Sequence, residues 1–169
     1  MKIYTSIASL FFAGCAATLG STGLVSVQGQ DDPLENIISV DTQSYTVERS
    51  LTKHFLRGFY SKESKTTAYQ LYVTTNSNDW MHWNNARFMI DGELVNVDAD
   101  KIGSDVACGQ YGCAHYEYVG IELTRDQLAS WAQNPTTVRI SGKVSGADQD
   151  IVIDQAEVEA FLLEVSALQ

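Results

Sequence analysis

Several residue types that mark particular functions are scarce in this chain of 169 residues. It contains three His, three Cys and two Pro, and 11 Lys and Arg stand against 21 Asp and Glu, which gives a formal net charge of −10. The shortage of basic residues disfavours binding to nucleic acids and to anionic lipid surfaces, because both are polyanions. The chain also lacks a run of about 20 continuous apolar residues, so it predicts no membrane-spanning helix.

The motifs of common catalytic sites are missing as well. The sequence has no H-E-x-x-H, no G-x-S-x-G and no phosphate-binding glycine loop, and its histidines, His54, His82 and His115, are far apart. We therefore expect no enzymatic activity and no cofactor. A hydrolase whose site is assembled from distant residues stays an alternative, because sequence spacing does not exclude a spatial triad.

The first residues have the pattern of an export signal. Lys2 is followed by an apolar run that ends in Leu10-Phe-Phe-Ala-Gly-Cys15. Ala-Gly-Cys resembles the lipobox of bacterial lipoproteins, with Phe12 where leucine is usual. The resemblance implies cleavage before Cys15 and a diacylglycerol on its thiol. An ordinary secretory signal, cleaved after Ala17, is the alternative.

The lipobox resemblance also implies a location. Residue 16 is Ala rather than Asp, which by resemblance to the sorting rule of Gram-negative lipoproteins favours the outer membrane, with the domain facing the periplasm or the cell surface. The chain would then meet the membrane through its N-terminal lipid, and an envelope protein is its expected partner. Cleavage after Ala17 would instead give a soluble periplasmic or secreted protein.

Cysteines of exported proteins usually pair in disulfides, so a chain with three cysteines leaves one without a disulfide partner. Lipidation of Cys15 accounts for it, and Cys108 and Cys113 then form an even pair in an oxidising compartment. We predict a disulfide that closes a small loop and stabilises the fold by about 2 kcal/mol in the chain-entropy model. A redox-active or zinc-binding pair fits less well, because the first favours two intervening residues and the second needs more ligands than this pair and His115.

Composition divides the chain into three predicted parts. Residues 1–14 form the signal peptide, and residues 15–36, rich in Gly, Ser, Thr and Gln, form the lipidated cysteine and a flexible tether. Residues 37–169 are long enough for one folded domain. In that domain, short β-type runs alternate with turn residues, and residues 98–112 are predicted to form a long loop. Strands are expected within residues 45–51, 55–60, 68–74, 80–83, 87–90, 93–97, 116–123, 138–140 and 151–153.

Turn and capping patterns connect these runs. Asp91-Gly92 predicts a two-residue hairpin, and the capping patterns that begin at Thr124 and Asp154 predict a short helix and an amphipathic C-terminal helix. The sequence thus predicts a mainly β fold, an antiparallel two-layer β-sandwich, Ig-like in architecture, with one interrupting helix and a C-terminal helix over one end. The segment from residue 116 to 168 is similar to β-sandwich domains of uncharacterised bacterial secreted proteins, a resemblance that carries no functional residue.

The densest aromatic stretch suggests a binding site. Trp80, His82 and Trp83 lie close together, and Tyr111 and Tyr116 lie near the predicted loop. Exposed on one face, such side chains would stack on a sugar ring or a peptide. Residues three apart in a strand face opposite sides, however, so at least one of the two tryptophans is expected in the core.

The acidic stretch that begins at Asp98 resembles the start of a calcium-binding loop. Asp98 and Asp100 occupy the first and third positions, but Ile102 and Gly109 stand where the motif needs ligands. The EF-hand interpretation therefore fails and no metal is predicted. A looser metal site of Asp98, Asp100 and Asp105 stays an alternative to a solvated loop.

The leading functional hypothesis is a lipid-anchored envelope protein that acts as a non-enzymatic interaction or structural module. It rests on the lipobox, the tether and the missing catalytic motifs. A small-ligand or carbohydrate-binding module around Trp80 and Trp83 is the first alternative, and the hydrolase is the second.

Overall fold

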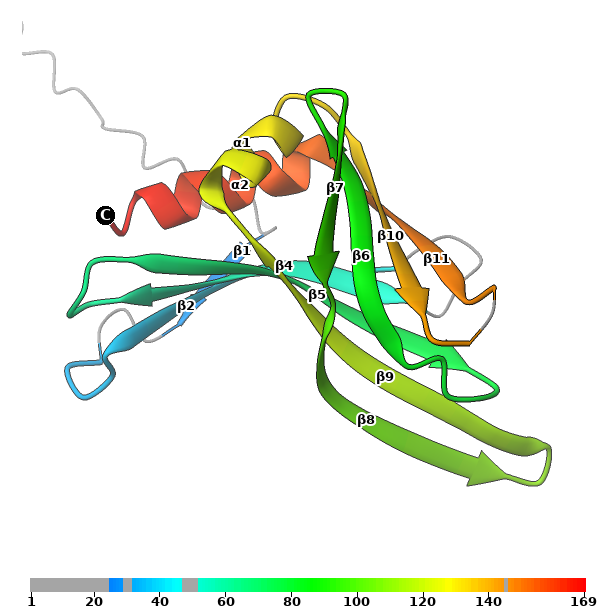
Figure 1. Cartoon of the computed structure of the whole chain (residues 1–169). Coiled ribbons are helices and arrows are strands. Elements are labelled where there is room, and N and C mark those ends of the chain that lie inside the picture. Colours follow the sequence, from blue (N-terminus) through cyan, green and yellow to red (C-terminus); the bar gives the residue numbers. More distant parts are fainter. Residues whose placement is uncertain (1–24, 29–31, 47–51, 145) are drawn as a thin grey trace, which may run out of the picture.

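The computed structural model describes residues 25–28, 32–46, 52–144 and 146–169, and the structural statements below concern these residues. They form two antiparallel β-sheets and two helices, which confirms the predicted two-layer β-sandwich with one interrupting helix and one C-terminal helix. Figure 1 shows the two sheets as separate layers, with both helices above the larger sheet.

The larger sheet, sheet A, has seven strands in the order β1-β2-β4-β5-β9-β8, with β3 paired to the start of β4. The strands are β1 (Val25–Gln28), β2 (Ile37–Thr42), β3 (Tyr45–Thr46), β4 (Lys53–Ser61), β5 (Thr67–Ser77), β8 (Asp100–Gly109) and β9 (Gly112–Leu123).

The smaller sheet, sheet B, has four strands in the order β11-β10-β6-β7. They are β6 (Trp83–Ile90), β7 (Glu93–Asp98), β10 (Thr136–Gly142) and β11 (Asp148–Ile153), while α1 (Arg125–Trp131) precedes β10 and α2 (Gln155–Ser166) follows β11. Among the described residues, neither helix is long and apolar enough to cross a membrane.

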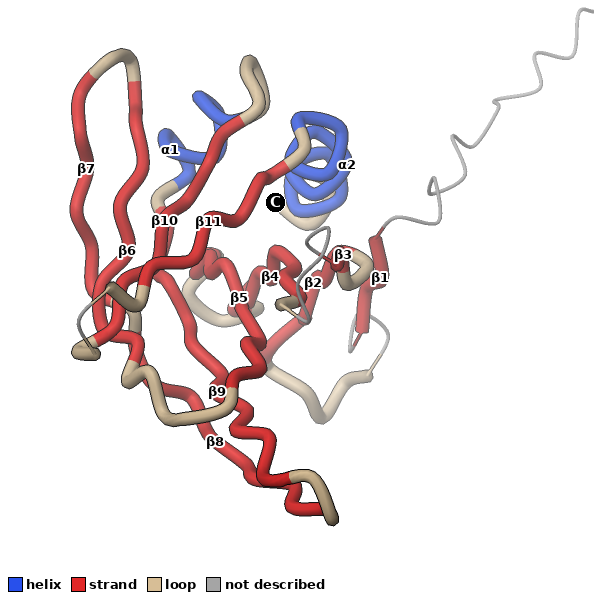
Figure 2. The backbone as a smooth tube through the Cα atoms, turned by 90° about the vertical axis from the view of Figure 1, so that its right-hand side faces the viewer, coloured by secondary structure: helices blue, strands red, loops and turns tan. Residues whose placement is uncertain are grey.

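The inner face of sheet A is covered by two different partners. Strands β6 and β7 of sheet B contact β8 and β9, whereas α2 contacts β1, β2 and β4. Figure 2 shows this division, with sheet B over one side of sheet A and α2 over the other. Leu71 and Val73 of β5 are fully buried in the resulting core. At Gly58 of β4, an added Cβ would lie 3.1 Å from the ring of Phe161, so glycine allows α2 to approach the sheet closely.

The local signals in the sequence act as predicted. Asp91 and Gly92 have φ values of 51° and 85° and join β6 to β7 in a two-residue hairpin, and both central positions of such a turn need positive φ. At α1, the Thr124 hydroxyl accepts a hydrogen bond from the Gln127 amide, and the Gln127 side chain accepts one from the Thr124 amide. The capping box at this helix is therefore confirmed.

Two predictions about irregular chain are wrong. The tether predicted to reach residue 36 contains β1, which pairs with β2 and places Val25 and Val27 against the core. The long loop predicted from residue 98 to 112 contains β8, which pairs with β9 along its length. Residues 104–109 are exposed on both faces, so the backbone ladder holds this strand without the alternation of apolar residues that predicts strands.

The outer part of the β8–β9 hairpin, residues 104–116, is called the arm below; residues 104–113 of it are exposed. Figure 1 shows it extending beyond sheet B. Cys108 and Cys113 lie directly opposite each other near its end, and their Sγ atoms are 2.09 Å apart, so the predicted disulfide is confirmed. Tyr111 lies at the tip and is 95% exposed. The signal peptide, Cys15 and the predicted strand residues 47–51 lie outside the described residues.

A buried polar cluster fixes α2 to sheet A. Glu157 of α2 is fully buried, where its Oε1 accepts a hydrogen bond of 2.6 Å from the Thr42 hydroxyl and its Oε2 lies 3.2 Å from Nε2 of His54. The Thr42 hydroxyl also accepts a hydrogen bond from the backbone amide of Leu56. Glu157 therefore does not close the capping box predicted with Asp154. It turns inward, and Asp154 alone caps the helix.

Replacing His54 with alanine should cost about 3–5 kcal/mol of unfolding free energy, because the Glu157 carboxylate would stay buried without the imidazole. Urea unfolding followed by circular dichroism measures this loss. Glu159→Ala on the exposed side of α2, which removes only a surface hydrogen bond to Gln155, is the control and should cost under about 0.5 kcal/mol. Equal small losses in both variants would contradict the role given to the buried cluster.

Candidate functional site

The aromatic residues that the sequence groups together are dispersed in the structure. Trp83 is 8% exposed and belongs to the core, where its Nε1 donates to the Thr75 hydroxyl at 2.8 Å, which confirms that at least one tryptophan is internal. Trp80 precedes β6 and packs edge-on against His115, with ring centroids 4.7 Å apart. Tyr111 is at the tip of the arm. Trp80, Trp83 and Tyr111 therefore do not share one exposed surface, but His82 and Trp83 both line a cleft.

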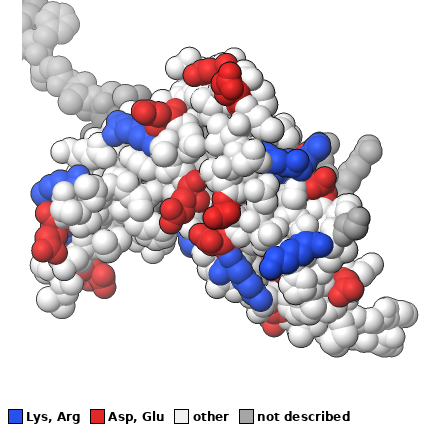
Figure 3. All heavy atoms as spheres, viewed as in Figure 1, with Lys and Arg blue, Asp and Glu red and all other residues white. Residues whose placement is uncertain are grey.

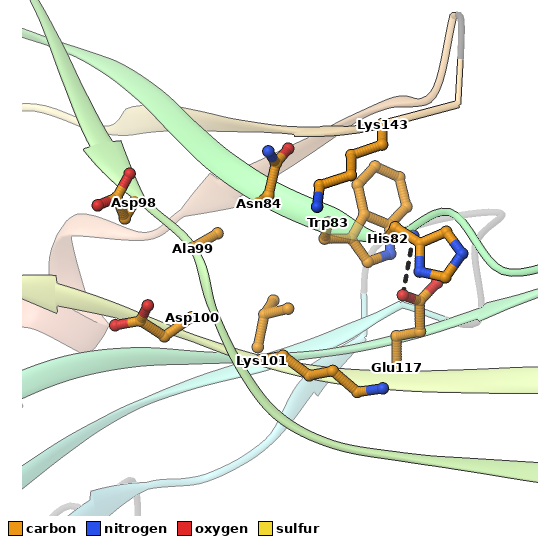
Figure 4. Close-up of a pocket in the computed structure, with 10 residues that line it drawn as sticks. His82, Trp83, Asn84, Asp98, Ala99, Asp100, Lys101, Glu117 and Lys143 are labelled. Atoms are coloured by element: carbon orange, nitrogen blue, oxygen red, sulfur yellow. Dashed lines mark hydrogen bonds between the residues drawn. The ribbon is translucent and has the colours of Figure 1, made fainter.

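A cleft of about 390 Å³ opens where the chain crosses from sheet B to sheet A. Figure 4 shows it in close-up. Its walls come from the start of β6, the crossing between β7 and β8, the middle of β9 and the turn after β10. The lining residues are His82, Trp83, Asn84, Asp98, Ala99, Asp100, Lys101, Glu117, Val119 and Lys143.

Glu117 connects the two sheets beside this cleft. Its carboxylate is buried and accepts hydrogen bonds from the backbone amides of Met81, at 2.7 Å, and His82, at 2.9 Å. The amide of Lys143 in turn donates to the carbonyls of Met81 and His82. Strand β9 of sheet A is therefore joined through Glu117 to the start of β6 and, through residue 143, to the end of β10. His82 is held in this arrangement with a left-handed φ of 55°.

The charged side chains beside the cleft do not all face into it. In Figure 4, the carboxylates of Asp98 and Asp100 point away from Lys101, Lys143 and His82. Asp100 pairs with Gly120, and its neighbour Lys101 pairs with the buried Val119, so these two side chains lie on opposite faces of sheet A. Within the described part of the chain, no carboxylate oxygen lies within the 4.0 Å limit of an ion pair to either lysine. Figure 3 shows that the face seen in Figure 1 carries acidic side chains near its middle and basic ones to their right.

The three residues proposed as a loose metal site are not gathered into one. Across the described ranges of the chain, no group of three or more His, Cys, Asp or Glu side chains is placed to hold a metal ion. Asp98 ends β7, and Asp100 and Asp105 lie five residues apart along the extended β8, where a rise of about 3.3 Å per residue separates them too far to share an ion.

A second feature lies on the outer face of sheet A, which sheet B and α2 do not cover. Phe55, Tyr72 and Tyr118 come from the adjacent strands β4, β5 and β9, and all three are half-buried. The rings of Phe55 and Tyr72 have centroids 4.9 Å apart, and the ring of Tyr72 is stacked on that of Tyr118 at 6.4 Å. These three residues are called the aromatic row below. Tyr116, predicted as part of the other cluster, lies on this outer face because it alternates with the buried Glu117.

A row of polar residues runs beside the aromatic row. Asp41 pairs with Arg57, Arg57 with Gln70 and Gln70 with Glu122, so the four residues, called the polar row, cross β2, β4, β5 and β9 in register. Nε of Arg57 donates to the Gln70 side chain at 2.8 Å, and the guanidinium lies 4.5 Å from the centroid of Tyr72. Gly120 leaves space for the side chain of Gln70, since a Cβ at residue 120 would overlap the amide group of Gln70.

Shallow clefts border the two rows. Three of them, of about 370, 370 and 410 Å³, share the side chain of Phe59. One also contains Asp41, and burial raises the pKa of this carboxyl, which the hydrogen bond from Ser39 and the charge of Arg57 offset only in part. The outer face therefore combines half-exposed rings, hydrogen-bonding groups and hollows between them.

The sequence contains part of the signal for this surface. In β4, β5 and β9, aromatic residues alternate with the aliphatic residues of the core, which indicates a second apolar face on each strand. Three separate strands with this pattern do not reveal that their rings meet. That depends on the strand order and register, which the residues between the strands do not specify.

No protein family, no curated protein and no solved structure matched this chain in our comparisons.

Asp41→Asn should raise the unfolding midpoint at about pH 7, by at most about 2 °C. Because the pKa of Asp41 is raised in the folded state, this carboxyl stabilises the fold fully below its unfolded value of 3.8, and the contribution is lost as the pH rises through the folded value. The gain from Asn should therefore vanish near pH 3. Thermal unfolding followed by circular dichroism over this pH range measures the difference.

Asp150→Asn is a matched control, because it should change the unfolding midpoint at neutral pH in the opposite direction. Hydrogen bonds from Arg139, 2.6 and 2.7 Å long, lower the pKa of Asp150, so its contribution is present above the unfolded value of 3.8 and is lost as the pH falls through the folded value. This variant should lower the midpoint slightly at neutral pH and converge with the parent protein in acid. A shift in the same direction for both variants would contradict these assignments.

Proposed function

We propose that this domain is a non-enzymatic binding module that holds a polysaccharide on the outer face of sheet A. The observation that carries the proposal is the aromatic row, three half-exposed rings in contact across adjacent strands, beside a polar row in register. This replaces the Trp80 and Trp83 region with Phe55, Tyr72 and Tyr118 as the binding residues.

The two rows supply the two kinds of contact that a sugar chain needs. A pyranose ring has apolar C–H faces, which pack on aromatic rings, and hydroxyl groups at its edges, which need donors and acceptors. Arg57 and Gln70, which are hydrogen-bonded to each other through Oε1 of Gln70, offer planar N–H donors, and Asp41 and Glu122 offer carboxylate acceptors. Because the rows lie side by side, one sugar chain would meet both at once.

Charge favours this ligand over a nucleic acid, which would also stack on aromatic rings. The protein has a net charge of −10, and two of the four residues in the polar row are carboxylates. A phosphate backbone would meet two carboxylates and only one cation, Arg57, in the polar row, and binding of polyanions depends on neutralisation by Lys and Arg. An uncharged glycan meets no such cost.

The binding module is, in this proposal, exported and tethered to the outer membrane by a lipid on Cys15. The lipobox resemblance and the odd number of cysteines support the anchor, and the Cys108–Cys113 disulfide suits an oxidising compartment. A lipid tether would present the domain to envelope or surface polysaccharides and to envelope proteins.

Tyr72→Ala and Tyr118→Ala should each weaken polysaccharide binding by about 1 kcal/mol or more, a factor of about 5. The measurement is affinity electrophoresis and sedimentation with a panel of cellulose, chitin and β-1,3-glucan. Tyr111→Ala is the matched control, because it removes an exposed tyrosine at the tip of the arm, away from the aromatic row. Binding that is lost in Tyr111→Ala and kept in both row variants would contradict the proposed surface.

Cys15→Ser should abolish both the lipid and the cleavage before residue 15 in an expressing Gram-negative host, so the chain should lose the lipid mass, keep its signal peptide and no longer reach the outer membrane. Fractionation and intact mass spectrometry measure both effects. The control is the double variant Cys108→Ser and Cys113→Ser, which should stay in the membrane with its lipid. A Cys15→Ser chain that is still membrane-bound and processed as in the parent would rule out lipidation.

A further inference from the structure

We propose that the free edge of β8 in the arm binds an extended, basic segment of a partner protein, which adds a strand to sheet A. The backbones of Ser104, Val106 and Cys108 would pair with this segment, and Asp105 would meet a lysine or arginine of the partner. The inference does not depend on polysaccharide binding or on the lipid anchor.

Strand β8 has a single neighbour among the described strands. It is the last strand of sheet A and pairs with β9 alone, and Figure 1 shows it on the outer margin of the arm. Residues 104–109 are exposed on both faces, so neither sheet B nor α2 covers the strand there. An edge strand of this kind presents unpaired N–H and C=O groups, which are a template for another strand.

Ser104, Val106 and Cys108 direct these backbone groups away from β9. In an antiparallel ladder, pairs that exchange hydrogen bonds alternate with pairs that do not. The Val106 amide donates to the side chain of Asp105 at 2.8 Å, and an amide engaged in this way is not part of the ladder. The Cα atoms of Cys108 and Cys113 are 4.0 Å apart, closer to the about 4.5 Å of a non-bonded pair than to the about 5.5 Å of a bonded one. The register with β9 then places the even-numbered residues of this segment at the open edge.

The edge lacks common features that keep edge strands from pairing. Natural edge strands are often protected by lysine, proline or a bulge. Residues 104–109 contain neither lysine nor proline, and the bulge in β8 lies before them, between Lys101 and Gly103. The carboxylate of Asp105 covers the Val106 amide, but an incoming strand can replace it. A backbone carbonyl of the partner would then accept from the amide, and a basic side chain would pair with the carboxylate.

Charge favours a basic segment over a second copy of this chain. Asp105 is the only charged residue from 104 to 114, and the whole chain has a net charge of −10. Two copies joined along β8 would bring these net negative charges together, which opposes association. Val106 follows Asp105 in the strand and so lies on the opposite face, where it is 46% exposed. The matching partner segment therefore alternates basic and apolar residues.

The disulfide keeps this edge formed in the absence of a partner. A two-stranded hairpin without a core is marginally stable in water, and residues 104–109 have no covering layer. Cys108 and Cys113 join the two strands near the tip of the arm. A strand already held in its bound conformation lowers the cost of binding.

The test uses synthetic hexapeptides with blocked ends, in which valine alternates with lysine in the probe and with glutamine or glutamate in the controls. Hydrogen–deuterium exchange is followed by NMR with up to about 10 mM peptide. The lysine peptide should slow amide exchange at Ser104, Val106 and Cys108, with little change at Asp105 and Ala107, which face β9. The glutamine peptide should bind at least about five-fold more weakly, and the glutamate peptide more weakly still.

Three variants separate the edge from the fold. Val106→Pro removes an outward amide, at a position where edge strands tolerate proline, so it should fold as the parent does and lose peptide binding. Val106→Ala keeps the amide and should keep binding. Asp105→Asn should weaken the lysine peptide about five-fold and leave the glutamine peptide unchanged. Polysaccharide binding should be unaffected in all three variants, which separates this proposal from the previous one.

Three peptide results would overturn the inference. They are unchanged exchange at Ser104, Val106 and Cys108 with about 10 mM lysine peptide, equal binding of the lysine and glutamate peptides, and full binding in a folded Val106→Pro variant. Protection of the same amides that rises with protein concentration in the absence of peptide would also overturn it, because the edge would then belong to a second copy of this chain.

Discussion

The inner face of sheet A has to be covered, and the way this is achieved governs the rest of the fold. Sheet A has seven strands and sheet B has four, so sheet B covers only the side that contains β8 and β9. The apolar residues on β1, β2 and β4 would be left in water without α2, at about 25 cal/mol for each Å² exposed. The C-terminal helix fills this gap, and the buried cluster of Glu157, His54 and Thr42 fixes its place. A buried carboxylate costs free energy unless it is paired. Any other position of α2 would separate Glu157 from His54 and Thr42, so this cluster specifies where the helix packs.

The same division leaves two surfaces with different chemistry. Where sheet B ends, the chain crosses between the layers beside a cleft lined by Trp83, Lys101 and Lys143, and Glu117 joins the two layers there through hydrogen bonds from the amides of Met81 and His82. The outer face of sheet A has no covering layer among the described elements, so the aromatic row stays half-exposed. Charged side chains border the cleft and aromatic rings lie on the outer face, and the packing of the two layers fixes both surfaces.

The sequence predicted most of the local structure and little of the spatial arrangement. The hairpin at Asp91-Gly92 and the cap at Thr124 were predictable because a few neighbouring residues determine them. Strand β8 was not, because the arm is held by its backbone ladder and shows no apolar alternation. Glu157 has the spacing of a capping residue, but pairing with His54, 103 residues away, determines its direction.

The aromatic row was missed for the same reason, whereas His82, Trp83, Asp98 and Asp100, which the sequence singled out, are among the residues that line the cleft. Trp80 and Trp83 are neighbours in sequence, but Trp83 is needed in the core. Phe55, Tyr72 and Tyr118 are distant in sequence and are brought together by the order of β4, β5 and β9. Sequence spacing reports proximity within one strand, whereas a surface on a sheet is assembled across strands.

The most direct test of the account is to locate a bound sugar on the protein. A soluble oligosaccharide of the polysaccharide that retains the protein would be added to the labelled domain, and intermolecular nuclear Overhauser effects from its C–H protons would be recorded. A sugar bound on the aromatic row should give contacts to the ring protons of Phe55, Tyr72 and Tyr118 and none to Trp80. Contacts to Trp80 or Tyr111, with none to the aromatic row, would contradict it.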